Sequence, residues 1–94
     1  MTIRLTLAGF PDLAARLGGD AVAVERGEGT IGDLVVWLQR THADAVGTRI
    51  LRRDGEIDES VQVLRNGGWV GRERMDDALV DGDEVTLLVL VAGG

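Results

Sequence analysis

The sequence predicts an α+β fold in which a mixed β-sheet packs against one main helix. Three observations indicate it. Alternating apolar residues open the chain, an apolar stripe at helical spacing follows Thr30, and a strongly apolar extended run lies near the end. The chain has 94 residues, the size of one domain, and its 45% hydrophobic residues are enough for a packed core. We expect residues 1–94 to form one domain with a flexible Ala-Gly-Gly tail.

The first two strands are predicted from period-2 patterns. Ile3, Leu5 and Leu7 alternate with polar residues, as in a strand with one buried face. Proline, glycine and aspartate between positions 10 and 20 are turn signals, so this segment is predicted as a long loop. Residues 21–25 then form a return strand that pairs with the first as a hairpin.

The main helix is predicted from its start signal and its apolar spacing. Thr30 has Asp33 three residues later, an arrangement close to a capping box. The apolar residues that follow form one stripe able to lie on a sheet: Ile31, Leu34, Val35 and Leu38. We expect the helix to end near residues 45–47, before a polar connection with a short turn around Ile50 and Leu51.

The remaining elements are strands joined by turns. A third strand is predicted over residues 61–65, and Asn66-Gly67 predicts a turn because both residues tolerate positive φ. The chain resumes an extended path at Trp69. Asp81-Gly82-Asp83 then predicts the turn into a final strand over residues 84–91.

The final strand carries apolar residues on both of its faces. Val85, Leu87, Val89 and Val91 share one face, and Leu88 and Leu90 share the other. This pattern predicts a strand that is buried on both sides or that bears a partner-binding face. A first strand with no earlier partner and a buried last strand fit best side by side and parallel at the sheet centre. That is the β-grasp arrangement.

Composition excludes several classes of function. A net charge of −6 argues against nucleic acid, whose phosphates require a basic surface. The absence of cysteine excludes disulfides and thiolate sites. Because there is neither a leader-like start nor a long apolar span, we expect a cytoplasmic protein without membrane contact. All ten basic residues are arginine, so the chain offers no lysine for Schiff-base chemistry or for isopeptide bonds.

Candidate residues inside the chain have simpler structural interpretations. His42 is the only histidine, too little for an ordinary transition-metal site, and is expected to be solvated near a helix end. The aspartates at 76, 77, 81 and 83 do not match a calcium loop and are interpreted as turn residues. Packing in the core is the default expectation for the three aromatic residues, Phe10, Trp37 and Trp69. With one histidine and no cysteine, we expect no metal site. Because no nucleophile, base and oxyanion donor assemble within the chain, we also expect no enzyme acting alone.

The C-terminus offers one reactive group. Gly93 and Gly94 have no Cβ, so they can thread a narrow tunnel and bring the α-carboxylate to another protein's active site. We therefore assign the reacting carboxylate to Gly94 and tail threading to Gly93. Leu88, Leu90 and Ala92 are assigned to partner binding.

A family resemblance rests on three motifs. Asn66-Gly67, the run Leu79-Val80-Asp81-Gly82-Asp83-Glu84-Val85, and the terminal Val91-Ala92-Gly93-Gly94 resemble the signature of the ubiquitin-like sulfur carriers. These include the small subunit of molybdopterin synthase, the thiazole-biosynthesis carrier, and relatives that serve cysteine synthesis or tRNA thiolation. In element order the resemblance covers essentially the whole chain. One departure is Leu88-Val89-Leu90, where relatives often have proline, and it bears on the choice of partner.

The resemblance implies a carrier mechanism. An adenylating enzyme related to ubiquitin-activating enzymes would use ATP to convert the Gly94 carboxylate to an acyl-adenylate. A sulfur donor would then replace AMP and leave a thiocarboxylate. A sulfur-accepting enzyme would take the sulfur, such as the large subunit of molybdopterin synthase or a cysteine synthase. The chain itself would bind no cofactor, and the ATP would belong to its activator.

Two alternatives stay open. The first is a β-grasp interaction module whose terminal glycines are never activated. The second is a protein modifier joined through Gly94 to lysines of other proteins. Because this chain has no lysine, such conjugates would be single, with no chain building through side chains.

Overall fold

The computed structural model describes residues 1–46 and 50–89. It contains one five-stranded sheet with the order β2-β1-β5-β3-β4. The strands are β1 (Thr2–Ala8), β2 (Ala21–Glu25), β3 (Val61–Arg65), β4 (Gly68–Trp69) and β5 (Glu84–Val89). The helices are α1 (Pro11–Leu17), α2 (Ile31–Thr41), α3 (Ala43–Val46) and the short 3₁₀ helix η1 (Arg72–Arg74).

The first and last strands of the described chain lie parallel at the centre of the sheet. β1 pairs with β5 from Arg4 opposite Glu84 to Ala8 opposite Leu88. β2 flanks β1 and β3 flanks β5, both in antiparallel register. The predicted central pair and the predicted hairpin of β1 with β2 are therefore confirmed, and the fold is a β-grasp fold with a mixed sheet.

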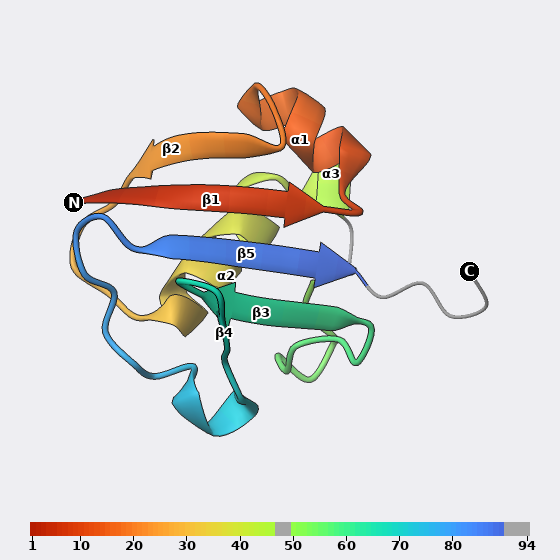
Figure 1. Ribbon diagram of the computed structural model, residues 1–94. Helices are drawn as coiled ribbons and strands as arrows, with labels where there is room; N and C mark the ends of the chain where they lie inside the picture. Colours follow the sequence, from red (N-terminus) through yellow and green to blue (C-terminus); the bar gives the residue numbers. More distant parts are fainter. Residues whose placement is uncertain (47–49, 90–94) are drawn as a thin grey trace.

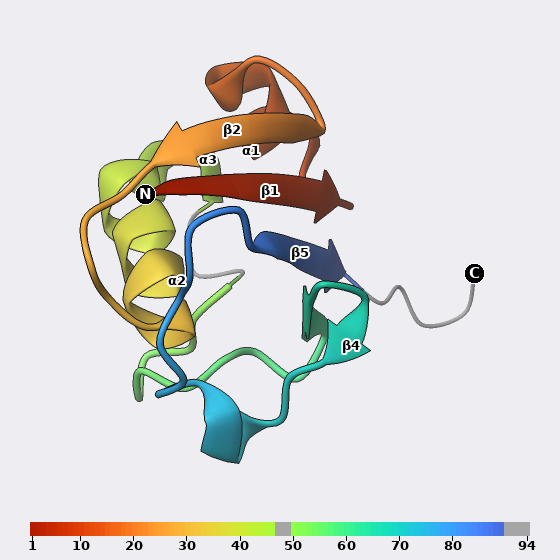
Figure 2. The same cartoon turned by 60° about the vertical axis from the view of Figure 1, so that its left-hand side comes forward.

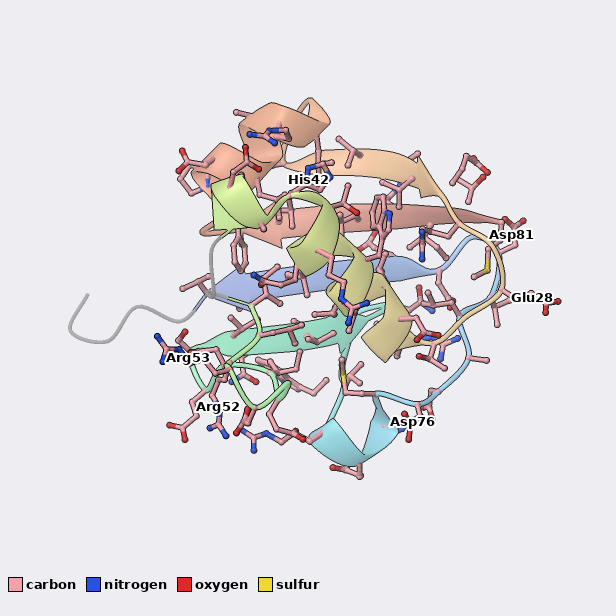
Figure 3. All side chains as sticks on the ribbon, turned by 180° about the vertical axis from the view of Figure 1, so that it is seen from behind. Glu28, His42, Arg52, Arg53, Asp76 and Asp81 are labelled. Atoms are coloured by element: carbon pink, nitrogen blue, oxygen red, sulfur yellow. The ribbon has the colours of Figure 1, made fainter. Side chains whose placement is uncertain are left out.

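A single layer of helix covers one face of the sheet (Figures 1 and 3). α2 crosses behind β1 and β5 in Figure 1, and its predicted stripe is buried. It packs in one core with the inward side chains of three strands, including Ile3 and Leu5 of β1, Val63 of β3 and Leu87 of β5. Within residues 1–46 and 50–89, no helix is both long enough and apolar enough to span a membrane.

The predicted capping box starts α2. The Thr30 hydroxyl accepts a hydrogen bond from the Asp33 N–H, and the Asp33 carboxylate accepts one from the Thr30 N–H. The prediction for the helix end was wrong. α2 ends at Thr41, His42 caps it by donating its N–H to the Leu38 carbonyl, and the separate turn α3 follows.

The segment predicted as a long loop contains a helix. Pro11 occupies the first turn of α1, where its fixed φ suits a helix and its missing N–H is not needed. Leu13 and Ala14 face the core, and Gly18 ends the helix with φ of 102°, a conformation that glycine adopts without steric cost. The turn signals therefore marked the two ends of a short helix and not a loop.

The predicted turns lie where the sequence places them. Asn66 and Gly67 both have positive φ and join β3 to β4, and Gly82 has φ of 87° before β5. After the undescribed residues 47–49, Ile50 is fully buried and Leu51 forms a β-bridge with Ile57. β5 confirms the predicted final strand up to Val89, and residues 90 and 91 lie outside the described chain.

Candidate functional site

The face of the sheet opposite α2 carries no helix among the described elements (Figures 1 and 2). Val85 and Leu87 of β5 are buried on the helix side, and Leu88 alternates to the other side, where it is half-buried. Leu88 is thus on the face predicted for it. The structure confirms its direction, and its assignment to partner binding stays a prediction.

On this outer face Leu88 has one small apolar and one polar cross-strand neighbour, Ala8 of β1 and Gln62 of β3. In the next row of the same face, Leu64 of β3 lies between Thr86 of β5 and Trp69 of β4. Residues paired in register share a face, and diagonal neighbours lie within reach of large side chains. We call Ala8, Leu64, Trp69 and Leu88 the open-face patch.

Trp69 was expected in the core, and this expectation was wrong. Its exposed fraction is 63%, the highest among the large hydrophobic residues of the described chain. The two-residue turn Asn66-Gly67 places Trp69 opposite Leu64, which lies on the outer face because Val63 points inward. Counting register across that turn is therefore the sequence signal that identifies Trp69. An exposed tryptophan beside half-buried apolar residues is typical of a contact surface.

Ala8 and Leu88 of the open-face patch lie next to the point where β5 ends, and Leu64 and Trp69 lie beside Thr86, further back along the strand. Val89 is the last described residue of β5 and pairs with Val61 of β3. The other predicted site residues, Leu90, Ala92, Gly93 and Gly94, lie outside the described residues. Their assignments stay predictions.

The Asp-Gly-Asp motif has a structural role at the other end of β5. Asp83 is 7% exposed, and its carboxylate accepts hydrogen bonds from Arg65 Nη2 at 2.7 Å, Asn66 Nδ2 at 3.0 Å and the Val80 N–H at 2.8 Å. Burial alone would raise the pKa of Asp83. The three hydrogen bonds and the Arg65 charge outweigh burial and hold this pKa below its usual value.

Hydrogen bonds connect the turn at Asp81 and Gly82 to Thr2 at the start of β1. Asp81 Oδ1 accepts a hydrogen bond from the Thr2 N–H at 2.7 Å, and the Gly82 N–H donates to the Thr2 carbonyl. Figure 3 shows Asp81 and Glu28 at the edge of the molecule away from the end of β5. The interpretation of these aspartates as turn residues is consistent with this geometry, and they hold β5 in register rather than act at its end.

His42 packs against an aromatic neighbour and is half-buried, so the expectation of a solvated residue was wrong. Its ring meets the Trp37 ring edge-on at 6.0 Å, and the Arg26 guanidinium lies 4.6 Å from the Trp37 ring centre on the same tryptophan. In the part of the chain that the structure describes, no group of three or more histidine, cysteine, aspartate or glutamate residues is placed to hold a metal ion.

Two hollows lie next to each other, the larger beside α2 and the smaller beside β3. Their volumes are about 370 and 220 Å³, and both are lined by Ile57, Arg72 and Met75. Asp33 and Asp76 border the larger hollow, and the Asp33 carboxylate already accepts the capping hydrogen bond from the Thr30 N–H. Neither hollow gathers a nucleophile, a base and an oxyanion donor from the described residues.

The fold and the outer face together define a small ubiquitin-like protein. Residues 10–94 match the ThiS family, and the chain belongs to this family. It is similar to small archaeal modifier protein 1 of Haloferax volcanii, with 36% identity over 86 residues that cover 90% of this chain and 94% of that protein. The crystal structure of that relative superposes with a TM-score of 0.76 at 33% identity and covers 100% of both chains.

Two further solved structures share the fold. The HVO 2177 protein of Haloferax volcanii has a TM-score of 0.77 and 30% identity, and the match covers 100% of this chain and 87% of that one. A chain in the complex of subunits 1 and 2 of the molybdopterin-converting factor from Helicobacter pylori has a TM-score of 0.62 and 16% identity, with 100% of both chains covered. This second likeness is one of fold alone.

Proposed function

We propose that this protein is a sulfur carrier whose Gly94 carboxylate is the reacting group. The carboxylate oxygen attacks the α-phosphorus of ATP, pyrophosphate leaves, and an acyl-adenylate forms. Hydrosulfide then attacks the acyl carbon, AMP leaves with the carbon–oxygen bond electrons, and a thiocarboxylate remains. The sulfur is finally passed to an accepting enzyme. Activation is needed because a free carboxylate is a poor acyl donor, whereas AMP is a good leaving group.

The observation that carries this proposal is the position of β5. It is hydrogen-bonded on one side to β1 and on the other to β3, with pairing up to Val89 opposite Val61. Five residues follow Val89 and end in two glycines. A chain of five residues can span at most about 18 Å. The carboxylate can thus reach a deep active site while the globular part stays outside.

The open-face patch supplies a docking surface for such enzymes. Tryptophan is enriched among residues that dominate interface energies, and Trp69 is the most exposed large apolar side chain of the described residues. Leu64 and Leu88 extend the same surface toward the end of β5. In this proposal, ATP and its metal ion are bound by the adenylating enzyme, and this chain binds no cofactor of its own.

A second candidate is a protein modifier joined through Gly94 to amines of other proteins. The observation that favours it is the 36% identity to a relative named as a modifier. It shares the adenylation step and differs in the nucleophile that attacks the acyl carbon, an amine in place of hydrosulfide. Because this chain has no lysine, modifier units would be attached singly.

The release of pyrophosphate tests the step that both candidates share. Wild type, Gly94→Val and Gly27→Val are incubated with the cognate adenylating enzyme and ATP. Gly27 is a matched control, because a Cβ there meets nothing within 4 Å. Wild type and Gly27→Val should release pyrophosphate at equal rates, and Gly94→Val should release none above background. Equal rates for all three would contradict activation at Gly94, and no release by any of them would favour a plain interaction module.

A further inference from the structure

Gly9 lies where β1 ends and makes an unusually close approach to β5. Its φ is +92°, and a Cβ built on its backbone would stand 2.9 Å from Val89 Cβ and 3.4 Å from Val89 Cγ2. Real Cβ atoms essentially never approach closer than 3.0 Å. Two independent constraints, the backbone angle and the space, therefore admit only glycine here.

The partner in this contact is the last described residue of β5. The parallel pairing of β1 with β5 ends at Ala8 opposite Leu88, one residue before Gly9 and Val89. On the other side, Val89 pairs with Val61 of β3, and its side chain packs against the core. Figure 1 shows β1 and β5 side by side with their arrowheads at the same edge of the sheet. Val89 therefore has Gly9, Val61 and the core as neighbours on three sides.

Gly9 differs from the other described glycines with positive φ. Gly18, Gly19, Gly55, Gly67 and Gly82 have open space where a Cβ would stand, so their conformations are explained by turns and a helix end. Among the described glycines with positive φ, Gly9 is the only one at which an added Cβ would meet another atom within 4 Å, and that atom belongs to β5. This contact is with the residue from which the reactive tail departs.

We propose that Gly9 is a positioning residue for the C-terminal carboxylate. Its missing side chain lets the end of β1 lie against Val89 and so fixes the point and direction in which residues 90–94 leave β5. This inference rests on the proposed activation of Gly94. A Cβ at position 9 forces Val89 to shift, and a misplacement of about 1 Å at a reacting group can cost roughly 100-fold in rate.

The test compares Gly9→Ala with Gly18→Ala. Both substitutions place alanine at a strongly positive φ, 92° and 102°, and only the first introduces a contact with Val89. Adenylation is measured with the variant as the varied substrate of the cognate enzyme. Gly9→Ala should lower kcat by about 10-fold or more and change KM by less than about 2-fold, because the open-face patch is intact and the carboxylate is misplaced. Gly18→Ala should match wild type in both constants.

Two further variants separate positioning from folding. Val89→Gly alone is the reference, because it removes the side chain that a Cβ at position 9 would meet without straining residue 9. The double variant Gly9→Ala with Val89→Gly relieves the collision and keeps the test open if Gly9→Ala alone does not fold. Its kcat should return to that of Val89→Gly alone. No recovery would contradict the contact as the cause.

Amide chemical shifts give a readout that needs no enzyme. In ¹H–¹⁵N spectra, Gly9→Ala should shift the signals of residues 90–94, and Gly18→Ala should leave them in place. Unchanged tail signals, or a raised KM with unchanged kcat, would overturn the inference while leaving the proposed function standing. No pyrophosphate release by wild type would instead overturn the proposed function, and the spectra would still decide whether Gly9 controls the end of β5.

Discussion

The guanidinium of Arg65 donates a hydrogen bond to the Asp83 carboxylate across 2.7 Å, and this contact joins the end of β3 to the residue before β5. Arg65 Nη2 also donates to the Ala78 carbonyl at 2.9 Å, so one side chain ties the strand to the segment before the turn. The Asp-Gly-Asp motif therefore connects the start of β5 to β1 and β3 through hydrogen bonds. Both of its carboxylates accept hydrogen bonds within the sheet and its turns, Asp81 from the Thr2 N–H and Asp83 from Arg65, Asn66 and the Val80 N–H.

Replacement of Asp83 by alanine should lower the free energy of unfolding by about 2–4 kcal/mol, because Arg65, Asn66 and the Val80 N–H lose a partly buried charged partner. Urea unfolding at pH 7 measures it. Asp76→Ala is the control, since Asp76 is exposed and should change stability by less than about 0.5 kcal/mol. Equal effects of the two substitutions would contradict the role of Asp83.

Asp83 should also make the fold sensitive to acid. Its pKa is lowered in the folded state relative to an ordinary aspartate at about 3.9, so its contribution is fully present above that value and is lost as the pH falls through the folded pKa. The stability advantage of wild type over Asp83→Asn should therefore be constant from pH 7 to about pH 5 and shrink below about pH 4. Urea titrations across this range measure it, and a constant difference down to pH 2 would show that the pKa is not lowered.

The sequence predicted the central parallel pair of β1 with β5 and the hairpin of β1 with β2, because the apolar patterns of these strands indicate which faces are buried. It did not place β3 beside β5. It did not predict α1, because a seven-residue helix has too few turns to show a clear apolar period, and Pro11 and Gly18 signal turns as well as helix ends. The early end of α2 was missed for a related reason. α3 continues the helical pattern after a break at His42, which no glycine or proline marks.

The candidate site was predicted only in part. Leu88 was found from alternation along one strand, a local signal. Trp69 was missed because its exposure depends on which strand it pairs with, and on the fact that β4 lies at the sheet edge beyond β3. Tryptophan is buried more often than not, so composition favoured the core. The close approach of Gly9 to Val89 could not be predicted, since it requires the spatial pairing of β1 with β5.

The core should depend on Leu38. It is fully buried on the face of α2 that packs against the sheet. Leu38→Ala should cost about 2–5 kcal/mol of unfolding free energy, as for other buried leucines. Arg40→Ala on the exposed side of the same helix is the control and should change stability by less than about 0.5 kcal/mol. An unchanged denaturation midpoint for Leu38→Ala would show that another face of α2 supports the core.

The open-face patch should govern binding more than folding. Trp69→Ser and Leu88→Ser should each weaken affinity for the adenylating enzyme by about 1–3 kcal/mol, because truncated interface anchors lose buried apolar contact. Val80→Ser is the matched control, an exposed apolar side chain that is not part of this patch. Titration calorimetry measures affinity, and thermal unfolding checks the fold. Affinities equal to wild type, or a loss that only follows unfolding, would contradict the docking role.

The most direct test of the central claim is the intact mass of the protein after reaction with its adenylating enzyme, ATP and sulfide. Wild type should gain the mass difference between sulfur and oxygen, with fragmentation locating the change at Gly94, and Gly94→Val should gain nothing. A gain equal to a second protein joined through Gly94 would instead support the modifier candidate. An unchanged wild-type mass, with an enzyme that has been shown to activate its carrier, would contradict the account.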